Sequence, residues 1–242
     1  MQIFGVKIDS ESKKNVLKKC LQNLQKSAKK PLFIVTLNPE ILLTAKKDLK
    51  YKKIINSANL RITDGFGIKF ISWLKKEKIG ARITGADLAQ FLLEKASDLK
   101  LKTGIIYLKE GWSTQKEIEK SLTAIKDFKL IGVKLENLEN FDSSQVKNCQ
   151  LILVAIGHPH QEIIIHNNLS NFKKARIIMG IGGTLDFWTK KKLRAPKIIR
   201  RLGLEWLWRL TLQPNRFFRI FNAVIKFPIL ALLSKQNEHP KN

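Results

Sequence analysis

Acidic residues are scarce in this chain of 242 residues, where 20 Asp and Glu stand against 45 Lys and Arg and give a formal net charge of +25. Such an excess indicates an anionic partner, which could be a nucleic acid, an anionic lipid or a substrate that carries phosphate. Much of it is lysine scattered over helical stretches, and such lysines are equally typical of a solvated surface.

Cysteine is scarcer still. Cys20 and Cys149 lie far apart and lack metal-ligand spacing, so we expect two buried thiols in a reducing cytoplasm rather than a disulfide framework.

No signal peptide opens the chain and no apolar run is long enough to span a bilayer. Metal and nucleophile motifs such as HExxH, paired CxxC, GxSxG and Asp-x-Asp are absent, and His158, His160 and His166 lack a partner set. We therefore expect neither a metal nor another cofactor.

Short apolar runs alternate with amphipathic stretches along most of the chain. The runs that predict strands are 31–37, 60–62, 103–108, 128–135, 150–156 and 175–181, with a short alternating strand at 2–8. Helical spacing lies between them, for example at 10–28, from Pro39 onward, at 114–126 and at 161–171. This alternation predicts an α/β fold, a Rossmann-like and mostly parallel sheet with helices on both faces.

Polar or glycine-rich stretches follow four of these strands, at 36–38, 63–67, 157–162 and 180–186. Ligands of open parallel sheets bind beyond the carboxyl ends of the strands, so these stretches are expected to line one crevice. The last contains Gly180, Gly182 and Gly183, which would let the backbone approach a phosphate group closely. An ordinary strand-to-loop turn explains it equally well, because the spacing matches neither the dinucleotide fingerprint nor the P-loop.

Asp64 is the best candidate for a general base, because it lies between a strand end and Gly65, where a carboxylate can face a cleft. An Asx turn or a helix cap is the alternative, and spacing alone favours that alternative.

The composition changes after residue 186. Residues 190–242 contain 13 Lys and Arg but only two acids, a net charge of +11 in 53 residues. Their aromatic residues are Trp206, Trp208, Phe217, Phe218, Phe221 and Phe227. We therefore divide the chain into an α/β core, 1–194, and a basic amphipathic helical appendage, 195–242, that binds a membrane interface. The alternative is a terminal helix whose aromatics pack on the core.

Six sequence blocks occur in one order: TLNP at 36–39, TDGFG at 63–67, RITGADL at 82–88, GHPHQE at 157–162, GIGGTLDF at 180–187, and RAP at 194–196 with GLEW at 203–206. Together they resemble the WecG/TagA/CpsF family of bacterial glycosyltransferases (glycosyltransferase family 26), over nearly the whole chain. The sequence departs from the family pattern at Lys190, where glycine is usual, and at Gln213, where Glu usually precedes the proline.

The resemblance implies an inverting, metal-independent transfer of N-acetylmannosamine from UDP-N-acetylmannosamine to N-acetylglucosaminyl-diphospho-undecaprenol, with a β-1,4 linkage. The product would enter wall teichoic acid linkage-unit or related cell-surface polysaccharide synthesis. Another UDP-sugar donor, such as UDP-glucose, stays open. The implied partners are the UDP-sugar, the polyprenyl-diphosphate acceptor and an anionic membrane surface. The implied location is peripheral, on the inner face of the bacterial cell membrane, and a homo-oligomer stays open.

The resemblance also implies residue roles. Asp64 would deprotonate the 4-hydroxyl of the acceptor sugar. Thr36, Asn38, Arg82 and Gln161 match polar positions of the substrate pocket, while Gly182, Gly183 and Asp186 fall on the donor side. Arg209, Arg216 and Arg219 match a segment that reaches the lipid diphosphate and the membrane.

A basic α/β nucleic-acid-binding protein is the alternative from another functional class. It would explain the charge, but the sequence contains no known nucleic-acid module and no stacking platform among its basic residues. We therefore expect no nucleic-acid partner.

Overall fold

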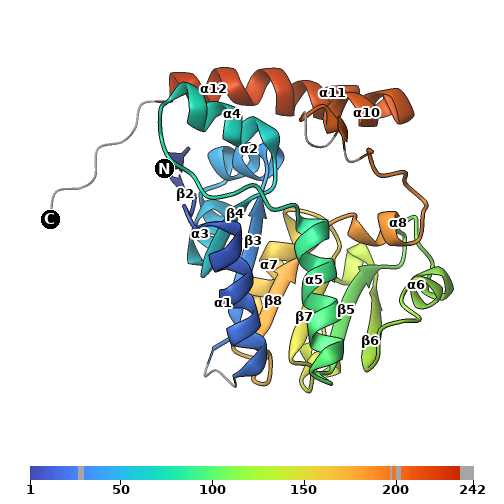
Figure 1. The fold of residues 1–242 in the computed structure, drawn as a ribbon. Coiled ribbons are helices and arrows are strands. Elements are labelled where there is room, and N and C mark those ends of the chain that lie inside the picture. The colour runs from blue at the N-terminus through green and yellow to red at the C-terminus, as the bar shows by residue number, and fades with distance from the viewer. Residues whose placement is uncertain (27–29, 197, 200–202, 235–242) are drawn as a thin grey trace, which may run out of the picture.

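Six parallel strands form the centre of the molecule (Figure 1). The computed structural model describes residues 1–242 except 27–29, 197, 200–202 and 235–242. The sheet runs in the order β4 (Leu60–Thr63), β3 (Leu32–Leu37), β8 (Ile177–Gly180), β7 (Leu151–Ala155), β5 (Thr103–Leu108) and β6 (Phe128–Val133). Each neighbouring pair in this order is parallel, which confirms the predicted Rossmann-like α/β fold.

Both faces of the sheet are covered, because its strands send alternate side chains in opposite directions. In β3, Phe33 and Val35 belong to one core cluster and Ile34 to the other. The first cluster includes residues of α2 (Pro39–Lys47), α3 (Leu49–Ser57) and α7 (His160–Asn167), and the second includes residues of α1 (Lys13–Gln25), α5 (Gly85–Asp98) and α6 (Gln115–Ser121). The other short elements before residue 190 are α4 (Phe66–Leu74), η1 (Leu135–Asn137), η2 (Ser143–Val146) and α8 (Thr184–Trp188).

The amino terminus corrects one prediction. Instead of a single strand over 2–8, it forms a two-stranded antiparallel hairpin of β1 (Gln2–Ile3) and β2 (Val6–Lys7). Phe4 and Gly5 both have positive φ, 54° and 77°. Two consecutive residues with positive φ are typical of the tight hairpin turns whose twist suits antiparallel strands, so the chain reverses there.

The C-terminal segment is a chain of short helices that lies across one end of the molecule, over α4 and α2 (Figure 1). Its elements are α10 (Glu205–Leu212), the 3-10 turn η3 (Pro214–Arg216), α11 (Phe217–Phe221), the π-helical turn η4 (Asn222–Lys226) and α12 (Phe227–Leu233).

Some aromatic side chains of this segment pack on the core and others are exposed. Phe227 is completely buried and belongs to the first core cluster, together with Ala231. Phe217, Phe218 and Phe221 remain exposed. One end of the segment therefore packs on the core while α11 presents its rings to the outside. Within the described part of the chain, no helix has both the length and the apolar character needed to cross a membrane.

Candidate active site at the carboxyl ends of the strands

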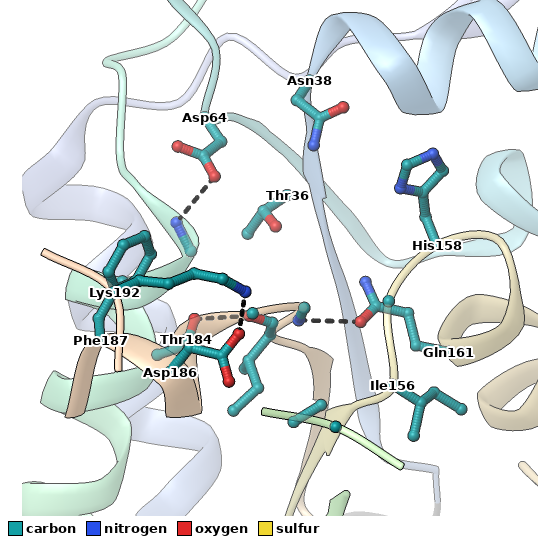
Figure 2. Close-up of a pocket in the computed structure, with 18 of the residues that line it drawn as sticks. Thr36, Asn38, Asp64, Ile156, His158, Gln161, Thr184, Asp186, Phe187 and Lys192 are labelled. Carbon is teal, nitrogen blue, oxygen red and sulfur yellow. Dashed lines mark hydrogen bonds and ion pairs between the residues drawn. The ribbon is translucent and has the colours of Figure 1, made fainter. Parts of the chain in front are cut away.

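A cavity of about 350 Å³ opens at the carboxyl ends of the central strands, within the size range of small-molecule sites. All four stretches predicted to line one crevice contribute to it (Figure 2). The lining residues from these stretches include Thr36, Asn38, Asp64, Gly157, His158, Gln161, Gly182, Gly183, Thr184 and Asp186. The predicted convergence of the strand ends is therefore confirmed.

Asp64 lies one residue beyond β4, and backbone contacts fix its position. Its N–H donates to the carbonyl of Leu37 at 2.8 Å, and its carbonyl accepts from Nε of Arg82 at 2.8 Å. The carboxylate borders the cavity, and its Oδ2 accepts from the N–H of Gly85 at 3.2 Å (Figure 2). The side chain is thus held at the start of α5 while facing the space where a ligand would bind.

Two further predicted pocket residues, Arg82 and Asn38, have structural contacts of their own. Arg82 is not among the described residues that line the cavity; it contacts the backbone of Asp64 and pairs with Glu205 of α10 at 3.4 Å. Asn38 lines the cavity, but its Oδ1 also accepts from the N–H of Ile41 at 3.0 Å and so caps α2. Both residues therefore help to hold the walls of the site.

Gln161 is buried and touches the glycine turn directly. Its Oε1 accepts from the N–H of Gly182 at 2.9 Å (Figure 2). Gly182 has a φ of +51°, a conformation that side chains other than glycine seldom adopt. This backbone N–H is thus already bonded within the protein, and Gln161 holds the turn in shape.

The carboxylate of Asp186 contacts two side chains that its position in the sequence does not predict. Its Oδ1 accepts from Oγ of Ser113 at 2.9 Å, and its Oδ2 pairs with Nζ of Lys192. The same ammonium group lies 4.4 Å from the centre of the Trp112 ring, in cation–π geometry. The carboxylate thereby holds a lysine at the cavity wall.

Lys192, Trp112 and Ser113 all line the cavity, although none of them was predicted from the sequence. Lys192 belongs to the run 190–192, which resembles a solvated lysine run when considered alone. The nearby RAP block is the sequence signal that could have identified it.

Glu40 connects the mouth of the cavity to the appendage. Its carboxylate accepts from Nε and Nη2 of Arg219 at 3.2 and 2.6 Å, a two-point contact between α2 and α11. Nε2 of His158 lies 3.9 Å from the same carboxylate. Burial lowers the pKa of His158, which favours its neutral form at this position. Arg219 therefore lines the cavity, and its predicted contact with a lipid diphosphate stays a prediction. The side chains of Arg209 and Arg216 lie outside the described part of the structure.

Arg194 is a further cation of the cavity wall. It pairs with Asp87 at 2.7 Å and donates to Oγ1 of Thr84 at 3.0 Å. Across the described residues, no cluster of three or more His, Cys, Asp or Glu side chains is arranged to hold a metal ion. A strand-end cavity that combines a carboxylate, a glycine turn and several cations is the kind of site that can bind a phosphate-bearing substrate.

The comparison with protein families agrees with this assignment. Residues 1–241 match the model of the glycosyl transferase WecG/TagA/CpsF family, and the chain belongs to that family. The resemblance inferred from the six sequence blocks is thereby confirmed.

Curated relatives narrow the comparison to one activity. The chain is 31% identical over 214 residues to the N-acetylglucosaminyldiphosphoundecaprenol N-acetyl-β-D-mannosaminyltransferase of Bacillus subtilis (strain 168), covering 85% of this chain and 80% of the relative. The enzyme of the same name from Bacillus spizizenii is 32% identical over 197 residues, or 80% and 76% of the two chains. That of Staphylococcus aureus (strain MRSA252) is 28% identical over 228 residues, or 91% and 87%.

Proposed function

We propose that this glycosyltransferase moves N-acetylmannosamine from UDP-N-acetylmannosamine to N-acetylglucosaminyl-diphospho-undecaprenol, with inversion and without a metal ion. The names of the relatives support this acceptor and this sugar. The observation that carries the proposal is that Asp64 and the 180–186 turn, distant in sequence, border one cavity.

Asp64 is the proposed general base. It would take the proton of the acceptor 4-hydroxyl as that oxygen attacks the anomeric carbon of the donor sugar. The bond between this carbon and the UDP oxygen would break on the opposite face, which inverts the configuration. A base that takes this proton in the transition state typically contributes about 10²–10⁴-fold in rate.

The departing UDP gains negative charge, and the donor side of the cavity would stabilise that charge. Lys192 supplies an ammonium group there, held by Asp186 and the Trp112 ring. The glycine turn, with its positive φ at Gly182, would let the backbone come close to the UDP. Gln161 would then contribute by keeping the turn in its bound shape.

The acceptor is a lipid diphosphate, so the proposal also requires a membrane surface. The helices α4, α11 and α12 lie at the same end of the molecule (Figure 1). Each carries a large apolar side chain that is mostly exposed: Trp73 at 71%, Phe218 at 77% and Leu233 at 74%. Exposed aromatics beside basic residues are typical of helices at an anionic membrane interface, where each basic residue contributes about 1 kcal/mol. Arg219 at the cavity mouth would meet the acceptor diphosphate, and the inner face of the cell membrane is the proposed location.

A transfer assay tests the function. Radiolabelled sugars from a panel of UDP donors, including UDP-N-acetylmannosamine and UDP-glucose, are offered with a lipid-diphosphate N-acetylglucosamine acceptor. We expect labelled lipid product with UDP-N-acetylmannosamine. Product with another donor only would refute the sugar assignment, and absence of product with every donor would refute the proposed reaction.

A further inference from the structure

A buried carboxylate lies directly behind Gln161. Glu162 on α7 is 2% exposed, and its Oε2 accepts from the hydroxyl of Tyr51 on α3 at 2.9 Å. Its Oε1 accepts from Nε2 of Gln161 at 2.6 Å. Both of these side-chain partners are neutral donors, and burial raises the pKa of Glu162 to about 7. Keeping such a group inside the core is costly, which indicates that it has a specific role.

The hydrogen bonds continue from Glu162 to the glycine turn. Gln161 donates to Glu162 with one end of its amide and accepts from the N–H of Gly182 with the other, at 2.9 Å. A Cβ atom on Gly180 would stand 2.6 Å from Nε2 of Gln161, so the amide is packed closely against the turn. Tyr51, Glu162, Gln161 and Gly182 therefore form one buried chain of contacts that ends at the cavity wall.

The two ends of a glutamine amide have nearly the same shape but opposite hydrogen-bonding roles. Oε2 of Glu162 accepts from Tyr51 and Oε1 is the acceptor that faces residue 161, so Glu162 selects the NH₂ end of Gln161 and leaves the oxygen to face Gly182. With the amide reversed, two N–H donors would oppose each other at Gly182. The carboxylate thus decides whether the turn has a hydrogen-bond acceptor.

We propose that Glu162 is a positioning residue, which fixes the amide orientation of Gln161 and through it the ligand-binding conformation of the 180–186 turn. The identity of the ligand, a UDP-sugar, rests on the proposed function. The structural part of the inference rests on the contacts of Glu162 alone.

Three single variants test this role. Glu162→Leu keeps a similar volume but removes the acceptor. Glu162→Gln can still offer its carbonyl oxygen to Gln161 and its NH₂ group to the Tyr51 oxygen. Ile165→Val truncates a fully buried side chain on the same helix without touching these contacts, so it controls for lost stability.

Two measurements on the full chain are used: calorimetric titration with UDP and amide hydrogen exchange of peptides that cover residues 180–186. We expect Glu162→Leu to weaken UDP binding about tenfold or more and to speed exchange in the turn, because Gln161 is no longer oriented. We expect Glu162→Gln to bind UDP within about threefold of wild type, and Ile165→Val to leave both measurements unchanged.

Unchanged exchange and UDP affinity in Glu162→Leu would overturn the proposal, as would a Glu162→Gln variant as impaired as Glu162→Leu. If Glu162→Leu does not fold, the double variant Gln161→Glu with Glu162→Gln replaces it. In this variant the carboxylate at position 161 can accept from the N–H of Gly182, and the amide at position 162 can donate to that carboxylate. Faster exchange of the turn in that folded double variant would also refute the orientation role. If wild type does not bind UDP, the donor assignment fails, while the exchange comparison still decides the role of Glu162.

Discussion

Phe227 is the side chain whose removal should separate the appendage from the core. It is fully buried, and its ring meets that of Phe4 edge to face at a centroid distance of 6.1 Å. Its Cδ1 would lie 3.7 Å from a Cβ atom placed on Gly67 of α4. Among the described residues of α10 to α12, the other fully buried side chain is the small Ala231. Phe227 is therefore the largest fully buried side chain among the described residues of these helices.

Truncating a buried Phe to Ala costs about 3–5 kcal/mol in protein cores. In Phe227→Ala, the loss falls on the docking of the C-terminal helices and leaves the strands of the sheet untouched. We expect these helices to detach in a large share of molecules while the α/β core stays folded. Transfer to the lipid acceptor should then fall sharply, whereas UDP binding should persist.

Hydrogen exchange measures this directly, with the peptides of α11 and α12 compared with those of β5. Phe218→Ala is the matched control, because that ring is 77% exposed and its loss should change neither region. If Phe227→Ala speeds exchange equally in β5 and α12, the segment and the core unfold as one unit and the reasoning is refuted.

Three further predictions concern the site. Asp64→Asn should keep UDP binding but lower single-turnover transfer by about 10²–10⁴-fold, and a rate within about threefold of wild type would remove Asp64 as the base. Transfer should persist in excess EDTA; a loss that Mg²⁺ or Mn²⁺ restores would show a metal requirement. Glu162→Gln should alter the pH dependence of stability. Because burial raises the pKa of Glu162 from 4.5 to about 7, wild type should lose unfolding free energy as pH rises through this range, while the variant cannot ionise there. Urea unfolding at pH 5 and pH 8 measures the difference, and parallel curves for the two proteins would contradict it.

The sheet and the crevice were predictable because they depend on local patterns. Apolar runs such as 103–108 correspond to β5 residue for residue, and parallel strands bring their carboxyl ends to one edge whatever the loops contain. Lys190, where the resemblance leads us to expect glycine, has a φ of 60°, a conformation that glycine adopts without steric cost.

The partners of the charged side chains were not predictable. Arg219 and Glu40 are 179 positions apart, and neither local spacing nor composition indicates that they meet. The buried and exposed aromatics of the C-terminal segment could not be separated either. Its helical pitch changes from 3-10 to α to π between residues 214 and 233, so a constant helical period assigns the wrong faces.

The cavity is far from positive in spite of the charge of the chain. Its described walls contain the cations Lys192, Arg194 and Arg219 but the carboxylates Glu40, Asp64, Asp186 and Glu205. Each of the three cations already holds a carboxylate: Asp186, Asp87 and Glu40 respectively. If the proposed diphosphate binds here, it would have to displace these carboxylates from the cations. Such an exchange would favour a ligand that presents several negative oxygens over a single free phosphate.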